Sequence, residues 1–321
     1  MHTCAPPITI LESWLEGWFH TGPRYTHLLL EAKQSSPTDL SASLRPYFES
    51  AHTDARRVFH KYAKLDLHPD ASAIGNTPQY PSSLPTTTRH GLFGEVLAGL
   101  VVESYLPDNG HIWSVPVFLF RYHADVGKYL FHLARDSTKK RQLWGRFGDD
   151  FIGVKFDAKG GIERFIVGEA KFRKTATKIT VDDLLLGSRE ETPPKSGTYI
   201  RKNNGIWEGF KNASQVPEGL AQLQAILIES ASEEYAEAIL SLDLVLAIQP
   251  QKTISRTDLV VIAGDNPKKR KSGETNIATA PRPPEYAAGR DLYVVEVFLH
   301  NGAELIEALY DSLWSGSADG T

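Results

Sequence analysis

The chain has 321 residues, of which 41% are hydrophobic and 23% charged, and its formal net charge is −4. This composition is typical of a globular protein and excludes a generally basic, histone-like binder, although it allows a local basic cleft. A single cysteine, Cys4, excludes an intramolecular disulfide and a zinc site built from cysteines. The sequence has neither an apolar run of the roughly 18–20 residues that cross a bilayer nor a signal-peptide pattern at its start. We therefore expect a cytoplasmic protein without membrane contacts.

The first part of the chain is predicted to be mostly helical. Apolar residues from Ile10 to Trp18 recur at helical spacing, and helical segments are predicted over residues 8–67. Prolines and threonines then punctuate residues 68–90, which is typical of a linker or an extended loop. This shift in composition predicts a boundary near residue 90. The two predicted regions are a mostly helical one, residues 1–90, and a second domain, residues 91–321.

The elements predicted beyond that boundary alternate between helices and strands. They are a helix over residues 91–105, a strand over 112–120, a hairpin with strands at 151–157 and 163–172, a helix at 217–230, a buried strand at 242–248, a strand at 292–298 and a helix at 303–314. Within the first of these strands, Pro116 favours an edge or a bulge, because proline cannot donate to a ladder. This order predicts an α/β fold with helices around a central sheet.

The hairpin carries the most informative residues. Two acids, Asp149 and Asp150, precede its first strand, and its second strand contains Glu169 and Lys171. Alternate side chains of a strand share a face, so Glu169 and Lys171 point the same way. Their neighbours along the strand are apolar, and an ion-forming pair there is costly unless something compensates for the lost hydration. A divalent metal ion together with a phosphate would compensate for it.

The oxygen atoms of this hairpin predict a site for a hard cation. Mg²⁺ takes carboxylate and carbonyl oxygens, which the side chains of Asp150 and Glu169 and the backbone carbonyl of Ala170 offer. Lys171 would then orient or deprotonate a water molecule and balance charge in the transition state. Asp149 and Asp150 point to opposite faces of a strand, so only one of them joins Glu169. Asp150 is favoured because it lies nearer the start of the strand, and Asp149 stays open as the alternative.

These residues resemble the Asp…Glu-x-Lys signature of the PD-(D/E)xK nuclease superfamily, the fold of many restriction endonucleases. The resemblance implies a restriction-endonuclease-like mixed central sheet flanked by helices, and cleavage of phosphodiester bonds that depends on Mg²⁺ or Mn²⁺. Members of the superfamily often carry a glutamate on the first helix, and Glu95 stands at the matching place, as an additional metal ligand or water anchor. The alternative for Glu95 is a solvent-facing side chain or a pair with Arg89 or His90.

Three blocks together are similar to the Hachiman A nucleases, the effector subunits of a bacterial antiphage system that act with a superfamily 2 helicase partner. The blocks are residues 93–97 (FGEVL), 148–153 (GDDFIG) and 167–172 (VGEAKF). The resemblance covers roughly residues 89–315 and departs from the pattern in an insertion over residues 173–215 and in a later loop. It implies a nuclease that acts on DNA and is held or released by a helicase partner subunit.

Two other interpretations compete with a nuclease. One is a catalytically silent module that keeps the nuclease fold and binds nucleic acid or regulates a partner. The other is an unrelated protein in which Glu169 and Lys171 form an interior salt bridge, because such pairs also occur without catalysis.

Basic residues around the hairpin are candidates for phosphate contacts, because neutralising the phosphate backbone drives non-specific affinity for nucleic acids. The candidates are Lys139, Lys140, Arg141, Arg146, Arg173 and Lys174. A further basic run, residues 268–271, lies in a polar loop bounded by prolines. A phosphate contact and a solvated loop explain this run equally well.

Overall fold

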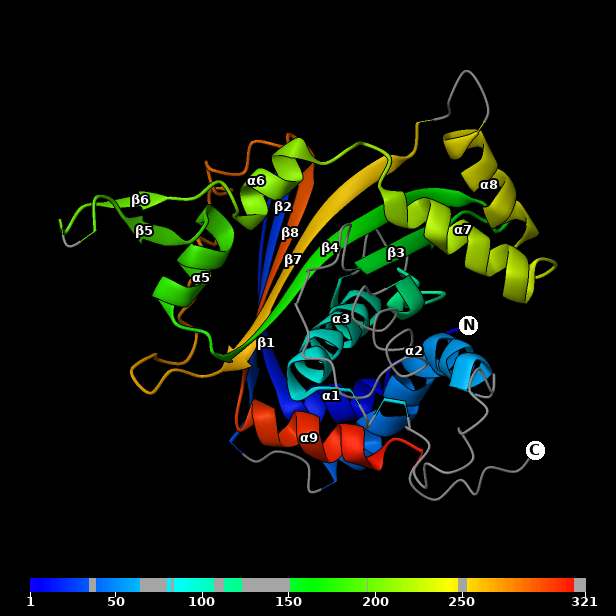
Figure 1. Ribbon diagram of the computed structural model, residues 1–321, viewed down its shortest axis with the longest axis horizontal. Helices are drawn as coiled ribbons and strands as arrows, with labels where there is room; N and C mark the ends of the chain where they lie inside the picture. The colour runs from blue at the N-terminus through cyan, green and yellow to red at the C-terminus, as the bar shows by residue number, and fades with distance from the viewer. Residues whose placement is uncertain are drawn as a thin grey trace, which may run out of the picture.

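The computed structural model describes residues 1–34, 39–63, 80–81, 84–106, 113–122, 151–194, 196–247 and 253–314 (Figure 1). The helices are α1 (Ile8–Trp14), α2 (Leu40–Ala63), α3 (Thr86–Tyr105), the 3-10 turn η2 (Phe120–Tyr122), α5 (Lys178–Leu186), α6 (Ile206–Asn212), α7 (Glu218–Ala231), α8 (Ala236–Leu246) and α9 (Gly302–Ser312). The strands are β1 (Leu15–Gly22), β2 (Tyr25–Ala32), β3 (Phe151–Phe156), β4 (Ile162–Thr175), β5 (Arg189–Glu191), β6 (Tyr199–Arg201), β7 (Ser255–Asp265) and β8 (Asp291–Leu299).

A mixed six-stranded sheet, in the order β1-β2-β8-β7-β4-β3, forms the centre of the described structure. The inner pairs β2–β8, β8–β7 and β7–β4 are parallel, whereas the outer pairs β1–β2 and β3–β4 are antiparallel. The predicted α/β class, with a mixed central sheet flanked by helices, is therefore confirmed.

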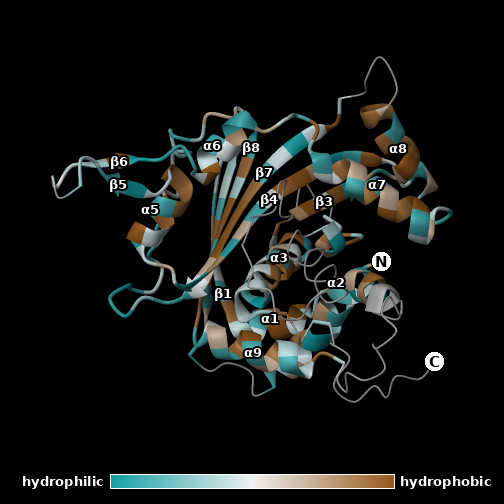
Figure 2. Cartoon of the chain, in the orientation of Figure 1, coloured by the Kyte–Doolittle hydropathy of each residue, from teal (hydrophilic) through white to brown (hydrophobic). Residues whose placement is uncertain are grey.

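Helices cover both faces of this sheet. Helices α1, α2, α3 and α9 lie on one face, here the α3 face, and α5, α6, α7 and α8 lie on the other, here the α5 face (Figure 1). In β7, Val261 packs into the core under α3, whereas Val260 and Ile262 pack with α5 and α6. Figure 2 shows hydrophobic residues in the middle of β7, where residues 259–263 are buried on both faces of the sheet. None of the helices in the described ranges is both long and apolar enough to span a bilayer.

The N-terminal region differs from the prediction. Helix α1 is short, and residues 15–32 form the hairpin β1–β2, whose second strand pairs in parallel with β8. Leu28 and Leu30 pack on the α3 face and Leu29 packs on the α5 face. A strand buried on both faces has no alternating pattern, so the apolar run resembled part of a helix. The prediction of a mostly helical region over residues 1–90 is therefore wrong at these two strands, which belong to the central sheet.

The predicted buried strand at residues 242–248 is also wrong. Its described part lies in α8, which buries Ala238, Leu242 and Val245 against the sheet. A short apolar run does not by itself distinguish a strand from a buried helix, and here the spacing of the buried residues is helical. The strand that pairs in parallel with β4 is β7, which follows later in the chain.

The predicted strand at residues 112–120 is reduced to one antiparallel bridge in the described part, residues 113–120. Ser114 and Val154 exchange two backbone hydrogen bonds of 2.8 Å each. Pro116 follows two residues later and has no N–H to extend the ladder. The segment therefore covers the outer edge of β3 without adding a strand to the sheet.

The other predicted elements are confirmed. Helix α3 contains the predicted helix 91–105, β3 and β4 form the predicted hairpin, and α7, β8 and α9 match the remaining predictions within a few residues. A Cβ atom added to Gly94 of α3 would lie 3.6 Å from the backbone nitrogen of Phe172 in β4. Helix α3 therefore packs closely against the strand that carries Glu169 and Lys171.

Candidate functional site

Glu169 and Lys171 form an ion pair on the α5 face of β4. The ammonium nitrogen of Lys171 (Nζ) lies 2.5 Å from Oε1 of Glu169, and the two side chains are 29% and 27% exposed. Their parallel partners in β7, Ile262 and Val260, pack in the core under α5 and α6. Ala170, between them, packs on the α3 face. The predicted shared orientation of Glu169 and Lys171 is therefore confirmed.

A cavity of about 770 Å³ lies beside this pair, between β4 and helices α5 and α6. Strand β4 contributes three charged side chains, those of Glu169, Lys171 and Arg173. The opposite wall includes the polar Thr180, Asp183 and Asn204 and the apolar Leu184, Ile206 and Phe210. The cavity thus has one charged wall and one largely uncharged wall.

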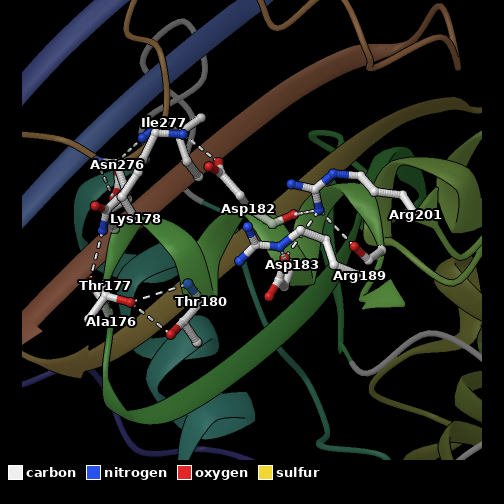
Figure 3. A network of polar contacts seen from close by, with 12 residues as sticks. Ala176, Thr177, Lys178, Thr180, Asp182, Asp183, Arg189, Arg201, Asn276 and Ile277 are labelled. Atoms are coloured by element: carbon white, nitrogen blue, oxygen red, sulfur yellow. Dashed lines mark hydrogen bonds and ion pairs between the residues drawn. The ribbon is translucent and has the colours of Figure 1, made fainter. Parts of the chain in front are cut away.

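Side-chain hydrogen bonds hold the N-terminus of helix α5 in place. The hydroxyl of Thr177 accepts a hydrogen bond of 3.2 Å from the backbone nitrogen of Thr180, as an N-cap side chain does (Figure 3). The amide of Asn276 also donates to the carbonyl oxygen of Ala176 at 2.9 Å. These contacts hold the start of α5 beside the end of β4.

The strands β5 and β6 belong to an arm (residues 189–194 and 196–201) that projects from the α5–α6 connection (Figure 1). Asp183 of α5 pairs with one arginine from each strand of the arm, at 3.0 Å from Arg189 and 3.3 Å from Arg201 (Figure 3). Since a two-stranded hairpin is at best marginally stable alone, these pairs fix its base at the rim of the cavity. Asp183 was not predicted from the sequence, although the acidic pair Asp182-Asp183 shortly before Arg189 was a usable signal.

Buried ion pairs hold the other end of the cavity wall. The carboxylate of Asp258 is fully buried and lies 2.8 Å from Nε of Arg256 and 2.9 Å from Nε of Arg290. The same arginines donate to the carbonyl oxygens of Ser214 and Phe210, at 2.5 and 2.6 Å. These two hydrogen bonds connect the C-terminal end of α6 to the arginines at the start of β7 and before β8.

Arg173 differs from most arginines of the structure in its electrostatic partners. Its guanidinium donates to the carbonyl oxygen of Phe172 at 3.0 Å. Among the described residues, no carboxylate lies within ion-pair distance of it, and partial desolvation lowers its pKa below the usual value. Lys174, the next candidate for a phosphate contact, is exposed and does not line the cavity.

Glu95 lies on the other face of the sheet. It is a buried residue of α3, 4% exposed. Burial is the main cause that raises the pKa of Tyr80 and of Tyr310, and the charge of Glu95 raises both further. Both tyrosines belong to the core under α3, so Glu95 is placed there. The structure therefore does not bring Glu95 together with Glu169 and Lys171.

A histidine joins the two tyrosines near Glu95. His52 is fully buried, with Nδ1 2.7 Å from the hydroxyl of Tyr80 and Nε2 3.0 Å from that of Tyr310. Burial lowers the pKa of His52 to about 3, so the imidazole is neutral at neutral pH. Of the residues named as alternative partners for Glu95, Arg89 lies 2.8 Å from Glu307 of α9, and His90 lies 3.7 Å from the same residue.

Several predicted site residues lie outside the described residues. They are Lys139, Lys140, Arg141, Arg146, Asp149 and Asp150. Strand β3 begins at Phe151, which pairs with Gly168, the residue before Glu169. Within the described parts of the chain, no three histidine, cysteine, aspartate or glutamate side chains gather in a group suited to a metal ion.

The basic run 268–271 divides into two kinds of residue. Arg270 forms a largely buried ion pair with Glu31 of β2, whose carboxylate also accepts from the hydroxyl of Ser272 at 2.7 Å and from the backbone nitrogen of Gly273 at 2.9 Å. Lys268, Lys269 and Lys271 are exposed. Arg270 therefore fastens the loop to the sheet, and the exposed lysines are the residues of the run that a phosphate could reach.

We compared the chain with known protein families and with curated proteins. No family matches it, and none of the curated proteins does.

Proposed function

We propose that the chain is a metal-dependent nuclease that cleaves phosphodiester bonds of DNA, with Glu169 and Lys171 as catalytic residues. The observation that carries this proposal is the carboxylate–ammonium pair of β4, which lines a cavity together with Arg173. A carboxylate, an ammonium and a guanidinium on one strand suit a reaction in which a metal ion and a phosphate are handled side by side.

In this proposal, the oxygens of Glu169 hold a divalent cation together with the carboxylate of Asp150 and the carbonyl oxygen of Ala170. The donor set is hard, which fits Mg²⁺ or Mn²⁺. When bound, the ion would polarise the phosphate and lower the pKa of a water molecule. Lys171 orients the attacking water and offsets the negative charge that develops on the phosphate oxygens.

The packing of strand β3 favours Asp150 over Asp149 as the second carboxylate of the proposed site. Ile152 packs on the α5 face, the face of Glu169, whereas Phe151 packs on the α3 face. Side chains two apart in a strand share a face, so the strand pattern favours Asp150 as the partner of Glu169. Glu95 has no place in the proposed site, because it lies in the core on the α3 face.

We also propose that this nuclease is the effector subunit of an antiphage defence system with a helicase partner. The support is the resemblance of three short blocks to Hachiman A nucleases, so this part of the proposal has its own test. Cells that express the chain with a co-encoded helicase should resist phage, and the Lys171→Ala variant should abolish that resistance. Equal resistance with the variant would contradict a nuclease effector.

A catalytically silent nuclease-fold module is the second candidate. Because Glu95 lies on the other face of the sheet, the described part of the cavity contains only two acidic side chains, those of Glu169 and Asp183. Asp183 is paired with two arginines. This small number of carboxylates for a metal ion favours the silent module. Incubation of the purified chain with DNA and Mg²⁺ or Mn²⁺ separates the two candidates. The nuclease predicts fragments that vanish when EDTA removes the metal, whereas the silent module predicts binding without fragments.

A further inference from the structure

We propose that the cavity beside Glu169 receives an unpaired strand of nucleic acid, with Arg173 as the residue that holds a phosphate next to the reacting one. This inference rests on the proposed function and names the form of its substrate. It follows from the two different walls of the cavity, from its size and from the electrostatic partners of Arg173.

The two walls match the two parts of a nucleotide. The β4 wall presents Lys171 and Arg173, which suit a phosphate, and the helix wall presents the apolar side chains of Leu184, Ile206 and Phe210, which suit the face of a base. In a duplex the faces of the bases are covered by stacking, so only the backbone and the base edges are available for contact. An unpaired nucleotide uses both walls at once.

The size of the cavity agrees with a short unpaired segment. Its volume of about 770 Å³ lies in the range of roughly 300–1,000 Å³ that is usual for sites enclosing small molecules. The helix wall is held on both sides, by Asp258 and its two arginines at α6 and by the cap of α5. A fixed wall opposite β4 keeps the cavity at this size, which suits a short unpaired segment.

Arg173 is available to an anion in the cavity. Arg189 and Arg201, at the rim, share the carboxylate of Asp183. Lys171 lies at 2.5 Å from Glu169. For Arg173, by contrast, the described structure contains no carboxylate at ion-pair distance, and a phosphate would supply the missing charge.

The inference is tested by binding to the Glu169→Gln protein, which keeps the cavity while its cleavage is suppressed. Fluorescently labelled single strands of DNA and of RNA and the corresponding DNA duplex are titrated at several salt concentrations. We expect a single strand to bind at least about tenfold more tightly than the duplex, since stacking adds to the backbone contacts. The DNA and RNA arms show which of the two strands the cavity prefers.

Arg282 supplies a matched control for Arg173. It also has no carboxylate within ion-pair distance among the described residues, but it lies outside the cavity lining and donates to the carbonyl oxygen of Arg290. In the Glu169→Gln background, Arg173→Ala should weaken single-strand binding by about tenfold and reduce the slope of log K against log salt by about 0.7. Arg282→Ala should leave both quantities unchanged, and Arg173→Lys should retain most of the salt slope.

The outcomes separate this inference from the proposed function. Equal or tighter binding of the duplex, binding of no nucleic acid, or equal effects of Arg173→Ala and Arg282→Ala would overturn the inference. Wild-type protein that cuts only duplex DNA would also overturn it while the nuclease proposal stands. Preferential binding of single strands, dependent on Arg173, without cleavage by the wild type would support the inferred binding mode and refute the nuclease.

Discussion

Glu95 and Glu169 lie on opposite faces of the central sheet. Glu95 is buried in α3 near Tyr80 and Tyr310, whereas Glu169 lines the cavity under α5 and α6 beside Lys171. The two glutamates therefore cannot have the same role, although the resemblance to the nuclease superfamily assigns both to one site. Their substitutions should affect different properties of the protein.

Replacement of Glu95 should reduce stability without abolishing cleavage. Glu95→Ala removes a buried carboxylate from a polar cluster, which typically costs about 1–3 kcal/mol of the free energy of unfolding. Glu169→Ala removes a partly exposed ion pair, for which we expect a change below about 1 kcal/mol. Denaturant titrations measure both values, and cleavage is assayed where each variant is folded. A folded Glu95→Ala protein as inactive as Glu169→Ala would refute this placement.

His52 should make the stability depend on pH. Its pKa is lowered to about 3 in the folded protein, so below about pH 6.5 the unfolded chain binds a proton that the folded protein does not. The free energy of unfolding should then fall as the pH decreases, by about 1.4 kcal/mol per pH unit from this residue, in the window between about 6.5 and 3. His52→Gln should be less stable at neutral pH but should lack this part of the slope. Identical slopes for the two proteins between about pH 6.5 and 5 would show that His52 titrates in the folded state.

Arg270 should be structural, in contrast to its neighbour in the basic run. Arg270→Ala leaves the largely buried carboxylate of Glu31 without its ion pair, and breaking such a pair typically costs about 3–5 kcal/mol. Lys269→Ala, a matched change at an exposed position, should stay within about 0.5 kcal/mol of the wild type. Thermal unfolding of both variants measures the difference. If the two variants unfold together, the Glu31–Arg270 contact does not fasten the loop.

The fold could be predicted from the sequence where the local residue pattern reflects which side chains are buried. The hairpin β3–β4 has a turn signal at Gly160, which adopts a positive φ of 86°, and its Glu-x-Lys pair was assigned correctly to one face. Strand β2 was missed because Leu28, Leu29 and Leu30 are buried on both faces of the sheet, so no alternation marks them.

Only the part of the site that lies on a single strand, β4, could be predicted from the sequence. Glu169, Lys171 and Arg173 share a face by the geometry of β4 alone. The position of Glu95 depends on which face of the sheet α3 packs against, and the role of Asp183 depends on the fold of a long insertion. Neither is encoded in local spacing, so a resemblance of short motifs could not supply them.

The most direct test of the central claim is cleavage of DNA by the wild type and by Lys171→Ala, in Mg²⁺ or Mn²⁺, with single-stranded and duplex substrates. Lys211→Ala is the matched control, because Lys211 is an exposed lysine that pairs with Glu208 outside the cavity lining. The nuclease proposal predicts that Lys171→Ala lowers the rate by about 10²–10³-fold, as loss of a group that stabilises the transition state does, while Lys211→Ala cuts like the wild type. Metal-dependent cleavage that is equal in all three proteins, or no cleavage by the wild type with and without a helicase partner, would contradict the assignment of Glu169 and Lys171 as a catalytic pair.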